Sequence, residues 1–398
     1  MTANDGVYER LLSDVRSKNV VACLQEIRST NAVTLTALSK ATGLSRPTVE
    51  SVVTELIHQG LVGELPSGQG ATHAAGRPAR RFAFLADSRR IMSVDVGIHR
   101  MRAMLANLAG TVTDELVWDV PDDADDLERF DFFADLTRSL LGVAGVAAQG
   151  VSNVTVAVPG IVDLTGNMLL SDALPQWVGV DLASQFRQRM SGTLVVENDI
   201  NMAALAEHAI GAARLASDVT YIQVGHRTNS ALILGGQLRR GRHFATGEVG
   251  GLPSSGWNQF GVDLNALPPH DSAAHRFERA KIGDPEATVW VRDFARSLAP
   301  GVSSLMLAVD PDVVIIGGGV SGAGDLLLDP LREALAEIIP AHMQPHILAS
   351  TIGVSGVAVG GIVRGLDEAS HKLYAGGATT TPRIDLAGLK EHTTRRNQ

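Results

Sequence analysis

Residues 45–57 read SRPTVESVVTELI, a stretch with the pattern of an amphipathic helix that begins at a capping residue. The hydroxyl of Ser45 can accept a hydrogen bond from the first turn, and Pro47 suits that turn because its missing N–H needs no partner there. Apolar residues then recur with helical spacing. We therefore expect a helix that buries five side chains, those of Val49, Val52, Val53, Leu56 and Ile57.

The opposite face of this helix is polar. Glu50, Ser51 and Thr54 point away from the apolar stripe, and Arg46 and Thr48 flank it near the start of the helix. Such side chains can contact base edges and phosphates in a major groove. The alternative is an ordinary three-helix bundle whose polar face only meets water. We predict DNA contacts from Ser45, Arg46, Thr48, Glu50, Ser51 and Thr54.

The residues on both sides favour a winged helix-turn-helix. A helical spacing of apolar residues begins at Val20, and a second short helix is expected from Thr34 as N-cap to Gly43. After the polar helix, Leu61-Val62 and residues 81–85 resemble two short strands around a glycine-rich turn, which is typical of a wing. We assign residues 1–88 to a winged helix-turn-helix DNA-binding domain.

Arg77 would place a positive charge on the wing, where it can contact phosphate or enter the minor groove. The charge distribution agrees with this assignment. Although the whole chain has a net charge of -9, residues 1–90 hold 11 Lys and Arg against 8 Asp and Glu. A basic module joined to an acidic domain is the asymmetry expected of a nucleic-acid binder.

The amino-acid composition indicates in which cellular compartment the protein is expected. The 398 residues include one cysteine, Cys23, which excludes an internal disulfide framework and a thiolate-rich zinc site. The N-terminus lacks the pattern of a secretory signal. The most apolar tract, residues 140–160, is interrupted by polar residues, so we expect no membrane span. These features predict a cytoplasmic protein.

Residues 89–375 alternate strand-like and helix-like segments. Strands are expected at 91–96, 102–107 and 111–120, and a comparable alternation follows Tyr221. This pattern predicts an α/β domain of two lobes, with a ligand-binding cleft between them. Residues 376–398 are expected to form a flexible tail.

The order of motifs in this domain resembles the ROK (repressor, open reading frame, kinase) family, whose members share a duplicated actin-like or ribonuclease-H-like fold. Six stretches match in the right order, and the winged module in front is similar to that of the family's regulators. The stretches are Val94–Gly97 with Asn107 and Gly110, Val158–Asp163, Leu174-Pro175 with Trp177, Glu197–Asn201, Gly247–Gly250, and Ile315–Val320 with Ala323–Asp325.

The resemblance implies which residues bind ligand. In the family's sugar kinases, the pair matching Asn198 and Asp199 grips sugar hydroxyls, the aspartate acts as general base, and the position of Glu248 is a further sugar-binding carboxylate. A carboxylate next to a hydroxyl suits both roles. We therefore predict a carbohydrate or carbohydrate derivative, neutral or cationic, bound by Asn198, Asp199 and Glu248.

The phosphate-binding loops depart from the kinase pattern. Family kinases carry Asp-x-Gly-Gly-Thr at the first loop, where this chain has Ile98 and His99 after Gly97, and a glycine-rich second loop where it has residues 225–230, GHRTNS. Close approach of backbone N–H groups to a phosphate needs glycines. Arg227 could still pair with an anion or could belong to a structural turn. We read Gly317, Gly318 and Gly319 as a structural turn as well.

The family's zinc site also departs from the pattern. Its histidine position is Gly251, and residues 254–263 contain no cysteine, so zinc would lack its ligands. Asp263 is a candidate to replace a lost sugar-binding glutamate, and His243 and Trp257 are candidates to reshape the pocket. We expect no metal and no cofactor.

These inferences predict a sugar-responsive transcription regulator, a repressor without kinase activity, that binds double-stranded operator DNA as a homodimer or a dimer of dimers. Two alternatives stay open at this point. One is an ATP-dependent sugar kinase with an added DNA-binding module. The other is a regulator driven by a protein partner rather than by a small ligand.

Overall fold

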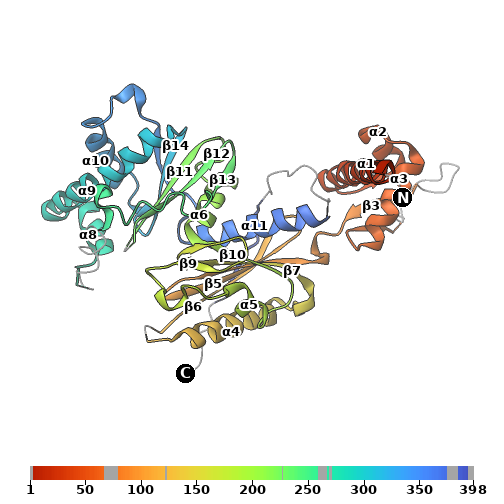
Figure 1. Ribbon diagram of the computed structural model, residues 1–398, viewed down its shortest axis with the longest axis horizontal. Helices are drawn as coiled ribbons and strands as arrows, with labels where there is room; N and C mark the ends of the chain where they lie inside the picture. The colour runs from red at the N-terminus through yellow and green to blue at the C-terminus, as the bar shows by residue number, and fades with distance from the viewer. Residues whose placement is uncertain are drawn as a thin grey trace.

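The computed structural model describes residues 3–66, 79–121, 123–225, 227–258, 267–268, 271–373 and 384–392. An N-terminal helical module lies at one end of the molecule, an α/β lobe occupies the middle, and a second α/β lobe lies at the other end (Figure 1). This arrangement confirms the predicted fold class, a winged helix-turn-helix followed by a two-lobed α/β domain.

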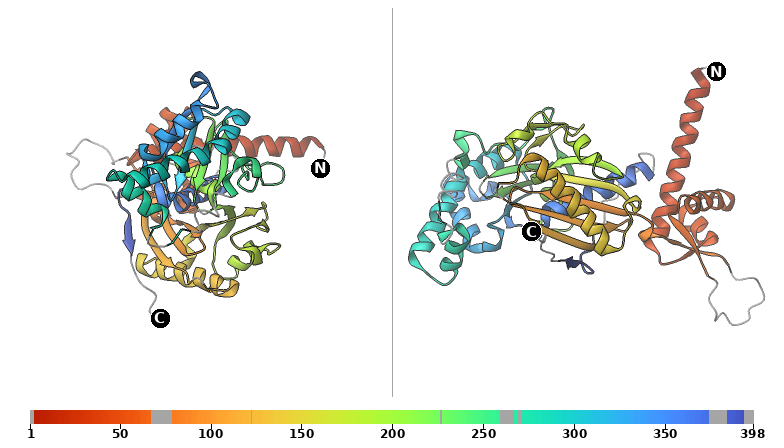
Figure 2. Two further views of the ribbon diagram at one scale, coloured as in Figure 1. Left: turned by 90° about the vertical axis from the view of Figure 1, so that its left-hand side faces the viewer. Right: turned by 90° about the horizontal axis from the view of Figure 1, so that it is seen from below.

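The N-terminal module contains three helices and a small antiparallel sheet in the order β1-β3-β2. Thr34 caps the second helix and Gly43 ends it in the left-handed conformation, while the Ser45 hydroxyl accepts a hydrogen bond from the Thr48 N–H. Figure 2 shows the first helix projecting away from the rest of the molecule. The elements are α1 (Ala3–Ser29), β1 (Val33–Thr34), α2 (Leu35–Thr42), α3 (Arg46–His58), β2 (Val62–Leu65) and β3 (Arg81–Phe84).

The expected apolar stripe of α3 is confirmed at four of its five positions. Val49, Val52, Val53 and Leu56 are buried, whereas the side chain of Ile57 remains 37% exposed. The chain turns just after this residue, and the fully buried Leu61 fills the neighbouring core position. The prediction that Ile57 is buried was therefore wrong.

The wing is built on β2 and β3, which pair antiparallel with Val62 opposite Phe84. At its base, the Arg80 guanidinium donates two hydrogen bonds to the Glu64 carboxylate, at 2.8 and 2.6 Å. Both expected strands of the wing are thus present. Arg77, predicted to contact DNA, lies outside the described residues.

The N-terminal lobe is a six-stranded sheet in the order β10-β7-β4-β5-β6-β16. Helix α4 packs on one face and α11 on the other. Its elements are β4 (Arg90–Val96), β5 (Arg100–Asn107), β6 (Val112–Asp119), α4 (Asp126–Ala144), β7 (Val151–Val158), β8 (Ile161–Val162), β9 (Met168–Leu170), α5 (Leu182–Arg187), β10 (Thr193–Asn198) and β16 (Lys390–His392).

The C-terminal lobe is a five-stranded sheet in the order β13-β12-β11-β14-β15. As in the first lobe, antiparallel strands precede parallel ones, which is the internal duplication that the sequence predicted. The remaining elements are α6 (Asp199–Ala209), β11 (Val219–Val224), β12 (Asn229–Leu234), β13 (Gln237–Arg239), α8 (Ala273–Lys281), α9 (Pro285–Val309), β14 (Val313–Gly318), α10 (Asp325–Ala336), β15 (His346–Ala349) and α11 (Gly356–Leu373).

Two helices exchange between the lobes. Helix α6 leaves the last strand of the first lobe and packs on β11 and β12, while α11 leaves the second lobe and packs on β4 and β7. The two helices cross closely because α11 has glycines at the contact. A Cβ atom on Gly360 would meet the backbone of Met202 in α6, and one on Gly361 would meet Ser93. This crossing joins the two lobes (Figure 1).

The N-terminal module is packed against the first lobe rather than held on a free linker. Arg89 donates to the backbone oxygen of Gln59 at 3.2 Å, and Arg28 donates to that of Leu108 at 3.3 Å. One continuous cluster of buried apolar side chains includes the core of the module and side chains of α11. The module therefore follows the position of the first lobe.

The C-terminal residues differ from the sequence prediction. Residues 384–392 do not form a flexible tail: β16 pairs parallel with β6 at the edge of the first lobe, and Ile384 is buried. The His392 Nε2 also lies within hydrogen-bond distance, 2.9 Å, of the Asp114 carboxylate. This segment covers a sheet edge that would otherwise expose unpaired backbone groups. In the described part of the chain, no helix is long and apolar enough to cross a membrane.

We predict that Gly360→Ala destabilises the protein by about 1–3 kcal/mol, because the added methyl group must displace the backbone of α6. Gly142→Ala in α4 is a matched control with open space around its Cβ position, and it should gain roughly 0.5–1 kcal/mol. Thermal unfolding of both variants tests this difference. Equal midpoints would show that the helix crossing is not tightly constrained.

Candidate functional site

The predicted ligand residues meet in one pocket between the lobes. Asn198 ends β10, Asp199 begins α6, and Glu248 lies on the loop after β13. All three line a cavity of about 100 Å³, together with Pro159 and residues 171–173 from the first lobe and Gln223, Arg227 and Asn229 from the second. The structure thus brings the three residues together, and their role in binding remains a prediction.

Asn198 is largely engaged by the protein itself. Its Oδ1 accepts a 2.9 Å hydrogen bond from the Asn201 N–H and caps α6, while its Nδ2 donates to the Gly160 carbonyl at 3.0 Å. One amide N–H is left for a ligand. Asn198 therefore has a structural role in positioning Asp199 at the pocket wall.

Asp199 carries the most perturbed carboxyl of the pocket. Its Oδ1 accepts a 2.8 Å hydrogen bond from the Ile200 N–H. Burial, followed by the negative charge of Asp95 and then of Glu248, raises the pKa of Asp199 to about 8. Burial also raises the pKa of Asp95 to about 7, although the positive charge of Arg102 opposes that shift. Both carboxyls are thus partly protonated at neutral pH.

Glu248 faces the pocket from the second lobe. Burial raises the pKa of Glu248 to about 7, against a lowering effect of its hydrogen bond from Asn229. The amide of Asn229 donates to the Glu248 carboxylate, and its Oδ1 accepts a 2.8 Å hydrogen bond from the Gly250 N–H. Asn229 therefore fixes the orientation of Glu248, a role that sequence reasoning missed because the two residues lie 19 positions apart.

Together these carboxyls favour a hydroxyl-rich or positively charged ligand. A partly protonated carboxyl can both donate and accept hydrogen bonds to hydroxyl groups. A cation would be attracted to the ionised form, whereas an anion would meet carboxylates of its own sign. Arg227, the cation at this pocket, donates a 2.7 Å hydrogen bond to the Asp172 carbonyl of the other lobe. Its guanidinium links the two lobes at the pocket rim.

Other residues that the sequence singled out lie away from this pocket. Trp257 is buried against α9, where its Nε1 donates to the Leu298 carbonyl at 3.2 Å, so it belongs to the core of the second lobe. His243 is exposed and does not line the cavity. Asp263, suggested as a replacement for a sugar-binding glutamate, lies outside the described residues.

Close packing at the end of β14 explains why glycines occupy positions 317 and 318. A Cβ atom on Gly317 would meet the Tyr221 ring, and Gly318 has a φ of +83° with the Val224 backbone close by. The first loop likewise forms a tight hairpin, in which the Gly97 N–H donates to the Arg100 carbonyl at 2.9 Å. This backbone N–H is therefore not available to cradle a phosphate.

No cluster of three or more His, Cys, Asp or Glu side chains suited to a metal ion occurs among the described residues. That statement does not extend to residues 259–266, which lie outside the described residues and overlap the segment 254–263 that matches the position of the family's cysteines. The absence of zinc therefore stays a prediction.

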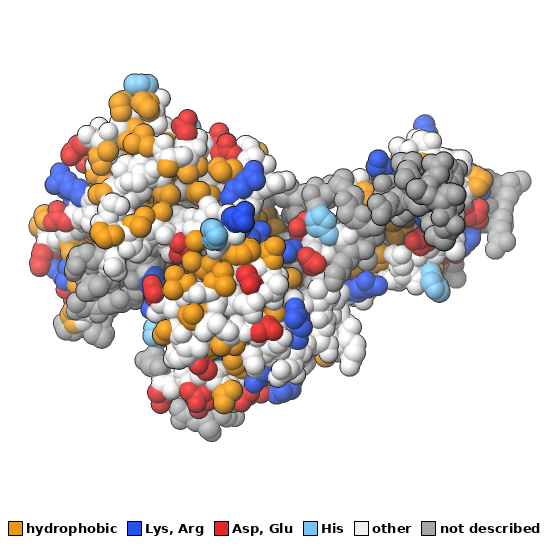
Figure 3. All heavy atoms as spheres, viewed as in Figure 1, with side chains coloured by type: hydrophobic (Ala, Val, Ile, Leu, Met, Phe, Trp, Pro, Cys, Tyr) orange, Lys and Arg blue, Asp and Glu red, His pale blue; other side chains and the backbone are white. Residues whose placement is uncertain are grey.

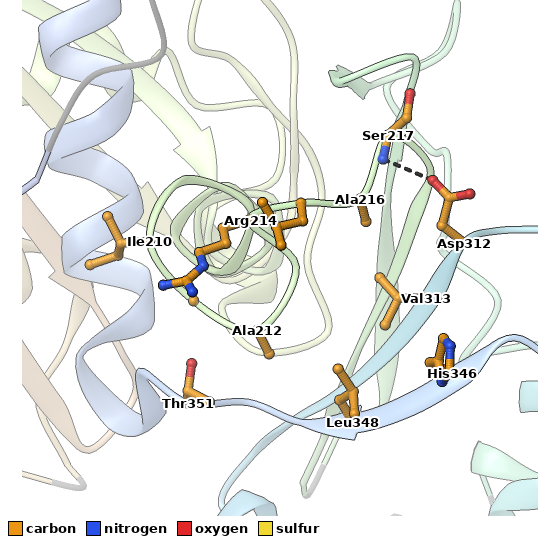
Figure 4. A pocket seen from close by; sticks show the side chains of 12 residues that line it. Ile210, Ala212, Arg214, Ala216, Ser217, Asp312, Val313, His346, Leu348 and Thr351 are labelled. Atoms are coloured by element: carbon orange, nitrogen blue, oxygen red, sulfur yellow. Dashed lines mark hydrogen bonds between the residues drawn. The ribbon is translucent and has the colours of Figure 1, made fainter.

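A larger hollow of about 850 Å³ lies on the second lobe, between the end of α6 and β15 (Figure 4). Its floor is apolar, with Val313 and Leu348 facing Ala212. The Asp312 carboxylate on its rim accepts two 2.8 Å hydrogen bonds from backbone N–H groups of residues 217 and 218. Both bonds go to Oδ2, and Asp312 is the one carboxylate among the described residues that line this hollow, whereas the inter-lobe cavity brings Asp199 and Glu248 together. We therefore place the ligand site between the lobes despite its smaller volume.

Apart from Arg77, the predicted DNA-contacting residues lie on α3 or at its N-cap. Arg46, Glu50, Ser51 and Thr54 are exposed on α3. The hydroxyls of Ser45 and Thr48 share a 2.7 Å hydrogen bond that stabilises the start of the helix, so both are partly used by the cap. Arg46 and Ser51 are left as the side chains best placed to contact a base edge.

Comparison with protein families matches residues 91–262 and 263–362 to the ROK family model. The chain belongs to the ROK family. Residues 19–66 match the IclR helix-turn-helix domain, which covers the C-terminal part of α1 and all of α2 and α3. The resemblance expected from the sequence motifs is thereby confirmed, including the helix-turn-helix in front of the two-lobed domain.

Individual ROK relatives include regulators and kinases. The xylose repressor of Caldicellulosiruptor bescii is 25% identical over 350 residues, which cover 80% of this chain and 87% of that protein. A ROK family transcriptional regulator homologous to the E. coli MLC protein has a TM-score of 0.69 at 20% identity and covers 91% of this chain and 98% of its own. A Streptomyces griseus ROK glucokinase, 25% identical with a TM-score of 0.59, covers 69% of this chain and 98% of its own.

We predict that Asp199→Asn stabilises the ligand-free protein increasingly as the pH rises. Because the pKa of Asp199 is raised from its ordinary 3.8 to about 8, the folded state holds a proton that the unfolded chain releases. Stability is therefore lost as the pH rises toward 8, at about 1.4 kcal/mol per pKa unit as an upper limit for this half-buried group. Asparagine avoids this loss, so the melting-temperature gain should be small at pH 4 and largest above pH 8.

Asp163→Asn should have the opposite sign and serves as the comparison. Burial alone would raise the pKa of Asp163, but hydrogen bonds from Thr165 and Asn167 outweigh it and lower the pKa to about 2. The asparagine variant should thus be less stable than the parent at neutral pH. A melting-temperature gain of Asp199→Asn that does not change between pH 4 and pH 8 would contradict the assigned ionisation.

Proposed function

We propose that this ROK protein is a sugar-responsive DNA-binding repressor without kinase activity. The observation that carries the proposal is the combination of a helix-turn-helix module, packed onto the first lobe, with a carboxyl-lined pocket between the lobes. The chain matches the xylose repressor of C. bescii over most of both proteins, and residues 19–66 match a helix-turn-helix family model. A location in the cytoplasm, where DNA and sugar are both accessible, is part of this proposal.

The DNA contacts come from α3 and the wing. The exposed residues of α3 enter the major groove, and the β2–β3 wing, including Arg77, follows the adjacent backbone. Regulators of this kind read two half-sites about one helical turn apart, so the active form is a dimer or a dimer of dimers. Salt weakens binding steeply because contacts to phosphates release counterions.

The absence of kinase activity is argued from the first loop and the pocket. A phosphoryl group needs backbone N–H groups and cations around it. Here the Gly97 N–H is used by the hairpin, and Arg129 donates to the Ile98 carbonyl at 2.9 Å. An assay of ATP consumption with xylose and glucose tests this part. Sugar-dependent turnover that is lost in Asp199→Ala would favour the kinase alternative.

The ligand is a neutral or cationic carbohydrate or carbohydrate derivative. Xylose is the first probe because of the relative's name, and glucosamine tests whether a positive charge is accepted. Glucose 6-phosphate is the matched anionic probe. Binding of its phosphate group would require a cation that offsets the repulsion from the carboxylates of Asp199 and Glu248.

We predict that Ser51→Ala and Arg46→Ala each weaken specific operator binding by roughly 1–3 kcal/mol if they contact a base edge. The operator is first selected from a random duplex library with the full chain, and affinity is then measured by fluorescence anisotropy. Arg292→Ala on the exposed face of α9 removes the same charge at the far end of the molecule and should leave affinity unchanged. Equal operator affinity of all three variants would contradict the assignment of α3 as the helix that contacts the bases.

We predict that Asp199→Ala keeps operator affinity nearly unchanged and loses the response to sugar. By linkage, a sugar that changes operator affinity must bind the operator complex with an affinity changed by the same factor. The measurement is operator affinity with xylose, glucose, glucosamine and glucose 6-phosphate. If the variant responds as the parent does, the pocket is wrongly assigned. If no sugar acts on the parent, a protein-driven regulator is favoured.

A further inference from the structure

Glu197 is a buried carboxylate held by two arginines. Its side chain is 8% exposed, and it lies next to Asn198 at the end of β10. Arg240 donates to both of its oxygens, at 2.7 and 3.2 Å, and Arg364 donates to Oε1 at 2.9 Å. A carboxylate shared between two guanidiniums has well-defined geometry because each donor is planar.

The three side chains come from three different parts of the protein. Glu197 is on the sheet of the first lobe, Arg240 directly follows β13 of the second lobe, and Arg364 is on α11. The contact between Glu197 and Arg240 therefore crosses from one lobe to the other. On the face shown in Figure 3, basic side chains gather where the lobes meet.

This ion-pair cluster connects directly to both halves of the ligand pocket. Glu197 adjoins Asn198 and Asp199 in the chain. Arg240 begins the loop that carries Glu248, and this loop is folded back on itself: the Thr246 N–H donates to the Arg240 carbonyl at 3.3 Å, and Gly241 has a φ of +72° with the Thr246 side chain against it. A shift of Arg240 must therefore move Glu248 relative to Asp199.

The cluster is connected to α11. Arg364 also donates to Glu368 at 3.1 Å, and its Nη1 lies 3.9 Å from a carboxylate oxygen of Asp367. Burial alone would lower the pKa of Arg364, but Glu197 and Glu368 outweigh it and raise the pKa, which keeps Arg364 charged. Val363 next to it belongs to the apolar cluster that continues into the DNA-binding module. Arg364 thus joins the inter-lobe contact to the helix nearest the module.

We propose that Glu197, Arg240 and Arg364 form a latch that holds the two lobes, and with them the two halves of the ligand pocket, in one arrangement. The latch positions Asp199 and Glu248 without touching the ligand. When the contact between Arg240 and Glu197 opens, the second lobe keeps the α6–α11 crossing but loses this link to α11, so the loop that carries Glu248 can shift and its position is passed less directly to the module. This regulatory role of the latch rests on the proposed function, whereas the latch itself does not.

Arg240→Gln is the decisive variant because Glu197 keeps Arg364 as its partner, so no buried charge is stranded. Arg239→Gln is the matched control: it removes the same charge from the neighbouring exposed residue, for which the described part of the structure contains no ion pair. Inter-lobe distance is measured in the ligand-free full chain with spin labels on Leu164→Cys and Ile282→Cys, whose parent side chains are 79% and 85% exposed. The native Cys23 is buried, and burial raises its thiol pKa to about 11, so it resists labelling.

We expect Arg240→Gln to broaden or shift the distance distribution, while Arg239→Gln matches the parent. Identical distributions for Arg240→Gln and Arg239→Gln overturn the latch. If Arg240→Gln fails to fold by circular dichroism and gel filtration, Arg240→Lys replaces it with the same expectation and the same overturning result, because lysine keeps the charge but cannot donate to both carboxylate oxygens in a fixed fork.

The regulatory role is tested with the sugar that acts on the parent. Arg240→Gln should raise the dissociation constant of that sugar at least tenfold relative to Arg239→Gln and reduce its effect on operator affinity, while the melting temperatures of the two variants stay close. Unchanged sugar affinity and response in Arg240→Gln overturn the role. A parent that responds to none of the four sugars counts against the proposed function, and the spin-label distances still decide the latch.

Discussion

The close crossing of α6 and α11 is the constraint on which the rest of the architecture depends. Helix α6 begins at the end of the first lobe and packs on the sheet of the second lobe. Helix α11 begins at the end of the second lobe and packs on the sheet of the first lobe. Gly360 allows backbone contact between α11 and α6. Because each helix also packs on the sheet of a lobe, the two helices cannot separate without exposing both sheets. The ligand pocket is at the start of α6, and α11 belongs to the apolar cluster shared with the DNA-binding module. One rigid junction therefore connects the pocket with the module.

Two neighbouring groups of carboxylates on this junction have opposite electrostatic environments. Glu197 faces two guanidiniums and is fully paired. Asp199, only two residues later, faces Asp95 and Glu248, and burial raises its pKa to about 8. Paired charges stabilise a defined arrangement of the lobes, whereas unpaired carboxyls are destabilising until a ligand satisfies them. Glu197 is near the end of β10 and Asp199 begins α6. The side chain of Glu197 therefore lies at the contact between the lobes, whereas that of Asp199 lies in the pocket.

Sequence patterns predicted what depends on local spacing and on family motifs. The caps at Thr34 and Ser45, the apolar stripe of α3 and the meeting of Asp199 with Glu248 all belong to this class. Features that depend on contacts between distant segments were missed. The exposure of Ile57 depends on where the chain turns, the support of Glu248 by Asn229 depends on strand pairing, and the burial of Trp257 depends on α9. The pairing of residues 390–392 with β6 has no local signal, because three consecutive polar residues carry no apolar alternation that would predict a strand.

The position of β16 has a consequence for the order in which this protein can be completed. The DNA-binding module and the strands β4 to β10 of the first lobe precede the second lobe in the chain, but the sheet of the first lobe is covered on one face by α11 and closed at one edge by residues 390–392. Both segments leave the ribosome only after the second lobe has been synthesised. Domains that finish folding during synthesis do so from their own consecutive residues. Here the sheet of the lobe nearest the module stays incomplete until α11 and residues 390–392 have been synthesised, so a chain that terminates before α11 would carry its reading helix on an incomplete support.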